Sequence, residues 1–185
     1  PHMSAYNYTF ARGWWFQAQS SFNISGIQAS YGNGSAANQS VEIVSFGSAP
    51  PILFPGPGGP HTTLFSAIDV PAGWQACCVP IVAGEYYAVV GAQHDPGMTT
   101  MFNSYGAAGQ NFIIDGIPTL ATRCILQSSL ALGTPAQGSY MSEASGSIGR
   151  VDILTGIGVS SGSYAYTWTP NIGLSDPNIA NPIAT

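Results

Sequence analysis

Short runs of β-branched and aromatic residues, separated by clusters of Gly, Pro, Asn and Ser, fill most of this chain. Such breaks recur roughly every 8 to 15 residues, and no long window carries an uninterrupted apolar stripe at helical spacing. The pattern therefore predicts an all-β fold. The spacing of the breaks favours an antiparallel two-sheet β-sandwich of jelly-roll kind over an arrangement of alternating strands and helices. The predicted strands cover residues 6–18, 22–31, 39–47, 62–69, 77–82, 86–93, 99–104, 111–115, 119–127 and 148–154.

The composition limits the classes of partner that the surface can bind. Charged residues make up 6% of the chain, with three Lys or Arg against eight Asp or Glu, whereas apolar residues reach 45%. The apolar share predicts a folded core, and the solvated surface must be built from hydroxyls and amides, as in many extracellular proteins. A net charge of −5 excludes the basic patch that nucleic acids need. No apolar stretch approaches the roughly 20 residues of a membrane span, so no membrane insertion is expected.

The cysteines are Cys77, Cys78 and Cys124. Adjacent side chains in a strand point to opposite faces, so one residue of the pair could reach Cys124 from a neighbouring strand. We predict a disulfide between Cys78 and Cys124, with three buried, reduced cysteines as the alternative. Because the histidines lie far from these cysteines in sequence, a zinc site is not expected.

Exposed aromatic rings and planar amides are the groups with which β-sandwiches bind sugars. Trp74, Tyr31, Asn103 and Tyr105 fall in predicted loops or at strand ends and are the candidate ligand-binding residues. For each ring, packing over the edge of the core is the alternative. The adjacent Trp14 and Trp15 must face opposite sides of their strand, so one of them is a further candidate contact.

Catalysis is not expected from this sequence. A nucleophilic triad needs a Ser, a base and an acid in contact, and the only bases beyond His2 are His61 and His94. Neither a Gly-x-Ser-x-Gly motif nor a suggestive pair of carboxylates is present. No cofactor is expected; calcium, held by Asp95, Asn103 and Asp115, is a weakly supported alternative.

A change of composition near residue 157 indicates a domain boundary. Residues 158–162 are rich in Gly and Ser, which is typical of linkers, and a new pattern follows. Residues 1–3 resemble the remnant of a cleaved tag. We therefore expect a β-sandwich domain over 4–157, followed over 158–185 by a linker and the opening of another module.

The pattern after the linker consists of a Tyr-x-Trp-x-Pro strand, a Gly-Leu-Ser turn and an Asn-Pro-x-Ala-Thr segment, within residues 164–185. It resembles the start of immunoglobulin-like (PKD-like) repeats in Bacteroidota surface proteins that the type IX secretion system exports. Residues 11–16 and 22–27 resemble, more loosely, a β-sandwich domain of secreted bacterial proteins. A truncated repeat would leave apolar residues such as Trp168 uncovered, so we expect this segment to pack on the first domain or on another chain.

These resemblances imply a secreted protein of the bacterial cell surface. The expected function is adhesion, or a structural or assembly role within a larger protein, with glycans, other surface proteins or a second copy as partners. A carbohydrate-binding module that uses loop aromatics is the alternative, and a hydrolase is a remote one.

Overall fold

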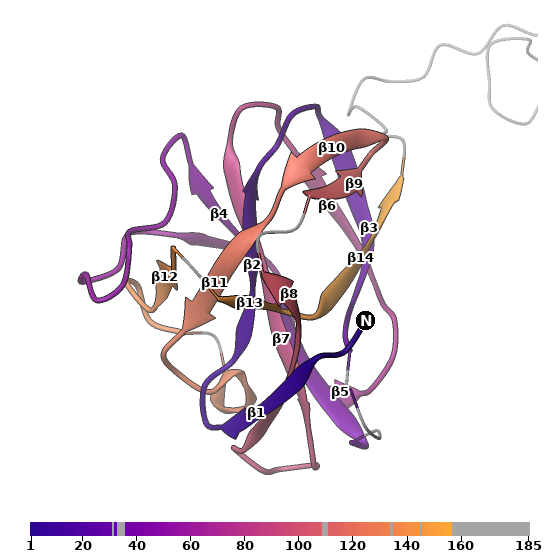
Figure 1. Ribbon diagram of the computed structural model, residues 1–185. Helices are drawn as coiled ribbons and strands as arrows, with labels where there is room; N and C mark the ends of the chain where they lie inside the picture. The colour runs from indigo at the N-terminus through magenta and orange to yellow at the C-terminus, as the bar shows by residue number, and fades with distance from the viewer. Residues whose placement is uncertain (31, 33–35, 109–110, 134, 145, 157–185) are drawn as a thin grey trace, which may run out of the picture.

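The computed structural model describes residues 1–30, 32, 36–108, 111–133, 135–144 and 146–156, and these form an all-β, sandwich-like fold (Figure 1). The predicted fold class is thereby confirmed. The strands are β1 (Ser4–Tyr8), β2 (Arg12–Gln17), β3 (Phe22–Ala29), β4 (Asn38–Gly47), β5 (Thr62–Pro71), β6 (Gln75–Ile81), β7 (Tyr86–His94), β8 (Met101–Ala108), β9 (Asn111–Ile114), β10 (Ile117–Leu120), β11 (Thr122–Leu126), β12 (Tyr140–Ser142), β13 (Ser147–Gly149) and β14 (Val151–Gly156), with one 3-10 helix, η1 (Leu130–Leu132).

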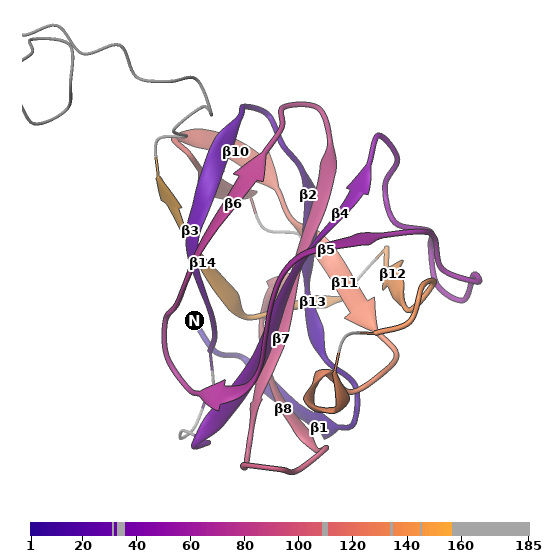
Figure 2. The ribbon, with the colours of Figure 1, turned by 180° about the vertical axis from the view of Figure 1, so that it is seen from behind.

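Two sheets form the body of the fold, and the described strands pair antiparallel throughout. In the nine-stranded sheet β7 is central: it pairs with β2 on one side and with β4 on the other. Beyond them lie β11 and β12 on the β2 side and β5 on the β4 side, while β1, β8 and β13 extend the sheet from the end of β7. The second sheet has the order β14-β3-β6, and β9 and β10 form a separate hairpin. Figure 2 shows β3, β6 and β14 side by side.

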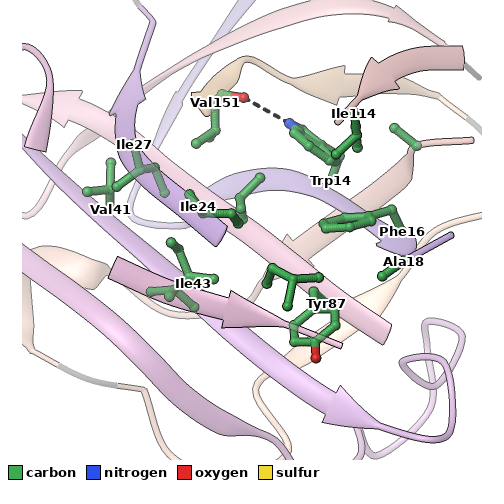
Figure 3. Packing of buried hydrophobic residues seen from close by; sticks show 14 of the residues in the cluster. Trp14, Phe16, Ala18, Ile24, Ile27, Val41, Ile43, Tyr87, Ile114 and Val151 are labelled. Carbon is green, nitrogen blue, oxygen red and sulfur yellow. Dashed lines mark hydrogen bonds between the residues drawn. The ribbon is translucent and has the colours of Figure 1, made fainter. Parts of the chain in front are cut away.

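The first face of the nine-stranded sheet packs against the three-stranded sheet. Alternation directs Trp14 and Phe16 of β2 into this core, where they meet Ile24 and Ile27 of β3 and Val89 of β7 (Figure 3). The Trp14 indole also satisfies its polar atom there, since Nε1 donates to the carbonyl of Val151 at 2.9 Å. Alternation on β2 and β7, together with a register shift in β3 between Ile24 and Gly26, accounts for this core.

The opposite, second face of the nine-stranded sheet is covered by irregular chain. The described residues of the segment 127–142, which carry η1 and β12, place Leu130 and Tyr140 on Val44, Val90 and other buried side chains. This face also buries polar groups, among them Glu42 and Ser40, which are fully inaccessible. The two faces of one sheet are thus covered by different kinds of structure.

The chain passes from one sheet to the other at Arg150. The prediction of one strand over 148–154 is corrected here, because β13 ends at Gly149 and β14 begins at Val151 in the other sheet. The Arg150 N–H donates to the Ser104 carbonyl at 2.8 Å, and its own carbonyl accepts from the Ser30 N–H at 3.0 Å. These two hydrogen bonds fix the crossing.

The predicted strands over 6–18 and 119–127 are also each divided in two. Between β1 and β2 the backbone of Ala11 turns to a different partner, since its carbonyl accepts from the Leu126 N–H at 3.1 Å. β12 was not predicted, because three residues are too few to show an alternating pattern.

The predicted disulfide between Cys78 and Cys124 is not formed. All three cysteines are free thiols: Cys78 is exposed on β6, whereas Cys124 is fully buried on β11 in the nine-stranded sheet. The inward member of the pair is Cys77, which packs on the first core. Burial raises the pKa of the Cys124 thiol well above its usual range, so this side chain acts as a small apolar group.

The expected boundary near residue 157 and the segment 158–185, including Trp168, lie outside the described residues. Among the residues that are described, no helix has the length and apolar character needed to cross a membrane.

Candidate functional site

Trp74 lies in the turn between β5 and β6, at the edge of the three-stranded sheet. Its side chain is 46% exposed, although a Trp ring is usually among the best-buried groups of a domain. The prediction of an exposed loop aromatic therefore holds at this position. A large exposed ring needs a fixed backbone to serve as a binding surface, because ordering a mobile ring on binding costs entropy.

Two glutamine amides fix the turn that carries Trp74. The buried Gln39 on β4 donates through Nε2 to the carbonyls of Gly73 and, at 3.4 Å, Pro71. Gln75 donates through Nε2 to the same two carbonyls, at 3.0 Å to Pro71 and 3.3 Å to Gly73. Gln39 is itself held, since its Oε1 accepts from the Ala29 N–H at 2.9 Å. The turn that carries the ring is thus held at the carbonyls of Pro71 and Gly73.

The Trp74 ring lies over Gly26 on the outer face of the three-stranded sheet. A Cβ on Gly26 would come within 3.4 Å of Trp74 Cε3 and within 3.1 Å of Leu154 Cδ1. Both side chains therefore lie close to the Gly26 backbone, and a side chain at this position would have to displace them slightly. The exposed Leu154, on the adjacent strand β14, extends the apolar surface beside the ring.

Planar polar groups continue the same face next to the ring. Gln28 lies two residues beyond Gly26 on β3, about 7 Å along the strand, and pairs across the ladder with Asp152. Its Nε2 donates to Asp152 Oδ2 at 3.2 Å, and the Ser30 hydroxyl donates to the same oxygen. We name the set formed by Trp74, Gly26, Leu154, Gln28 and Asp152 the outer-face platform.

Two of the other predicted ligand-binding residues are buried in β8, not placed in a loop. Asn103 is 1% exposed, and its Nδ2 donates to the carbonyls of Tyr6 at 3.1 Å and Phe10 at 2.8 Å. Tyr105 is 8% exposed, and its hydroxyl accepts from the Arg123 guanidinium at 2.9 Å. Both predictions are wrong, because β8 runs on to Ala108 and both side chains serve contacts far apart in sequence. Tyr31 lies outside the described residues.

A Ser, a His and an Asp do come together on the second face, which the sequence did not predict. Ser40 Oγ lies 2.9 Å from His94 Nε2, and His94 Nδ1 lies 3.8 Å from Asp69 Oδ1. His94 Nδ1 donates instead to the Asp95 carbonyl at 2.9 Å, so Nε2 accepts from Ser40. Ser40 Oγ in turn accepts from the Asp69 N–H at 3.0 Å.

Burial decides what this arrangement can do. Ser40 and His94 are both 0% exposed, so a substrate carbonyl has no path to the hydroxyl. The buried Ser40 and His94 pair with each other and with backbone atoms of β5 and the β7–β8 turn, as buried polar groups must. The set is structural. No nearby residue pattern could have revealed it, since the partners are 54 and 29 residues apart.

A second buried polar cluster surrounds Glu42. Its Oε1 accepts from the Thr63 hydroxyl at 2.7 Å, and its Oε2 accepts from the Tyr140 hydroxyl. Burial raises the pKa of the Glu42 carboxyl, although these two hydrogen bonds lower it in part. The ring of His61 packs edge-on against Tyr140, with centroids 4.7 Å apart, and burial lowers the pKa of His61. The cluster holds β12 on β4.

The calcium alternative gains no support from the geometry. Asn103 is 1% exposed within β8, and Asp115 accepts from the Ser20 hydroxyl at 3.2 Å. The turns that carry Asp95 and Asp115, between β7 and β8 and between β9 and β10, lie at opposite ends of the molecule (Figure 1). Within the described ranges, no three His, Cys, Asp or Glu side chains gather as metal ligands would.

Comparison with protein-family models, with curated proteins and with solved structures gave no match to this chain.

Proposed function

We propose that this chain is a non-catalytic adhesion domain of a secreted bacterial surface protein, and that it adheres by binding glycans on the outer-face platform. The observation that carries the proposal is the exposed Trp74 ring, which lies over Gly26 in a turn held by Gln39 and Gln75. A rigid ring loses little freedom when a ligand stacks on it.

The chemistry of the platform suits a sugar. The apolar face of a pyranose ring stacks on indole, while its hydroxyls need planar acceptors and donors beside the ring. The Asp152 carboxylate and the Gln28 amide offer these groups at about 7 Å along the strand. A carboxylate hydrogen-bonded in this way accepts from a sugar hydroxyl more strongly than a neutral oxygen does.

Secretion to the cell surface rests on the sequence and forms part of the proposal. A chain with only 6% charged residues interacts mainly through hydroxyls and amides at its surface, which suits contact with glycans and with other surface proteins. The resemblance of residues 164–185 to repeats of type IX secretion substrates supports the same location.

The test is a glycan array probed with the whole chain and two variants. We expect specific binding to a limited set of glycans, weakened at least about tenfold by Trp74→Ala, as for the truncation of other central aromatic contacts. Tyr8→Ala is the matched control: it removes another ring that is 53% exposed, on β1 and outside the platform. The control variant should bind as the unmodified chain does.

Equal binding by Trp74→Ala and by the unmodified chain would reject the platform. No binding to any glycan, together with self-association on a sizing column, would favour the structural or assembly role instead. The exposed apolar side chains of the same face, Leu154 and Trp74, would then be expected at the contact between copies.

A further inference from the structure

A groove opens at the end of the second face, where residues 127–142 no longer cover the nine-stranded sheet. It has a volume of about 250 Å³ and is lined by Trp15, Gln17, Gln19, Tyr86, Leu120 and Thr122. Trp15 is the outward partner of Trp14, and its neighbours across the strands are Ala88 and Thr122. The groove and the outer-face platform therefore lie on opposite sides of the sandwich.

Two aromatic rings form the apolar part of the groove. The centroids of Trp15 and Tyr86 are 6.0 Å apart, and their planes are inclined by 52°. The Trp15 indole is fixed, because its Nε1 donates to the Ser142 hydroxyl at 2.9 Å. Inclined rings of this kind can contact a flat ligand from two directions, one against its face and one against its edge.

The polar part of the groove is made of side-chain amides with their nitrogens already occupied. Gln17 Nε2 donates to the Gly84 carbonyl at 3.0 Å, and Gln19 Nε2 donates to the Gln17 carbonyl at 3.1 Å. Both amides are thereby oriented, and their Oε1 atoms carry no hydrogen bond within the described residues. The Thr122 hydroxyl adds a group that both donates and accepts.

The lining identifies the class of ligand. The described residues of the groove carry no charge, so an ionic ligand would lose its hydration without a counter-charge. Oriented amide oxygens favour a ligand that donates several hydrogen bonds, and the two rings favour one with an apolar face. The volume is below the roughly 300–1,000 Å³ of pockets for drug-sized molecules, which limits the groove to about one ring.

We propose that the Trp15–Tyr86 groove is a second binding site, which takes a single neutral pyranose ring, such as the end of a glycan chain. It stands independently of the outer-face platform, since the two sites share no residue. With both sites occupied, one domain bridges two glycan chains, and bivalent attachment of this kind raises avidity without any new contact.

The test follows the indole N–H signals of the intact chain by NMR during titration with cellopentaose, laminaripentaose, chitopentaose and mannopentaose. At about 10 mM sugar, ten times a Kd of about 1 mM, we expect at least one sugar to shift the Trp15 indole signal to near saturation. Tyr86→Ala should weaken this binding at least tenfold, whereas Tyr86→Phe, which keeps the ring, should weaken it less than threefold. Trp74→Ala should leave the Trp15 titration unchanged.

Gln17→Ala is the second variant, and it tests the groove even if Tyr86→Ala does not fold. Gln17 is exposed at the end of β2, so its truncation should leave the fold intact and still weaken binding at least threefold. The absence of any Trp15 shift with all four sugars would overturn the second site, as would unaltered binding by both Tyr86→Ala and Gln17→Ala. Shifts confined to the Trp74 signal would reject glycan binding in the groove and support binding on the outer-face platform. Shifts confined to the Trp15 signal would support the groove and reject the platform.

Discussion

The two faces of the nine-stranded sheet are buried by different means. On the first face, side chains of β2, β4 and β7 meet β3, β6 and β14 in a largely apolar contact, in which the buried amides of Gln39 and Gln93 pair the backbone of Ala29. On the second face, residues 127–142 form the cover, and Glu42, Ser40 and His94 are buried among the apolar groups. The first face supplies stability mainly through buried apolar area, while the second depends more on hydrogen bonds to buried polar groups.

The irregular cover of the second face leaves part of the sheet accessible at one end. A regular sheet covers its partner along its length, but an irregular segment can stop short and leave side chains such as Trp15 half-exposed. The groove exists because the cover ends at Ser142, whose hydroxyl holds the indole. We therefore expect substitutions on the first face to act on stability, and those at the open end of the second face to act on binding.

The largest loss of stability is expected from Phe16→Ala on the first face. Phe16 is fully buried between Trp14, Phe22 and Tyr87, and removal of such a ring leaves a cavity. The free energy of unfolding should fall by about 3–5 kcal/mol, measured by urea denaturation. Gln17→Ala, next to it on the exposed side, should change it by less than about 0.5 kcal/mol. Similar losses for both variants would show that the first face does not dominate stability.

The next largest effect is expected from Ser40→Ala on the second face. The change leaves the buried His94 Nε2 and the partly buried Asp69 N–H without their partner, which should cost about 1–3 kcal/mol in urea denaturation. The unmodified chain should also resist labelling by a fluorophosphonate probe, because the hydroxyl is buried and structural. Rapid labelling that Ser40→Ala abolishes would instead indicate a reactive serine and revive the hydrolase alternative.

A third effect concerns pH. Since burial raises the pKa of folded Glu42 above its unfolded value, its contribution to stability is greatest at low pH. As pH rises past the unfolded value the unfolded chain ionises first, so stability falls, by at most about 1.4 kcal/mol per pH unit for one group. The groups that face this carboxyl, Thr63 and Tyr140, are neutral hydroxyls and offer no counter-charge.

Glu42→Gln should therefore remove part of the decline in stability between acidic and mildly alkaline pH. The measurement is the difference between the two unfolding free energies at a series of pH values, so that other titrating groups cancel. A difference that stays constant with pH would contradict a raised pKa at the buried Glu42.

The smallest effect on stability is expected from Cys78→Ser. The exposed thiol makes no disulfide, so its loss should change the free energy of unfolding by less than about 0.5 kcal/mol. In the folded chain a thiol reagent should modify Cys78 quickly, and Cys124 only when the chain unfolds. A folded chain with just one titratable thiol after denaturation would instead indicate a disulfide.

The alternating strands were predictable from the sequence, because each was marked by its own apolar pattern and its own turn residues. The same reasoning placed Trp14 and Trp15 on opposite faces and left Trp74 exposed in its turn. These features depend on neighbours close in sequence, where the period of two and the chemistry of turns apply directly.

The buried polar contacts were not predictable in the same way. Gln39 holds a turn carbonyl 34 residues away, and Asn103 satisfies carbonyls 93 and 97 residues away. An amide suited to bind a sugar is equally suited to pair a buried carbonyl, and residue type alone does not distinguish the two roles. The outward direction of the half-buried Tyr86 could have been suspected, because Tyr86 and Tyr87 are adjacent in a strand and must face opposite sides.

The most direct test of glycan binding is calorimetric titration of the chain with the strongest ligand from the array. The account predicts saturable binding that Trp74→Ala and Tyr86→Ala each weaken and that the double variant abolishes, with the fold unchanged by circular dichroism. Undiminished affinity in the double variant would contradict glycan recognition by these aromatic surfaces.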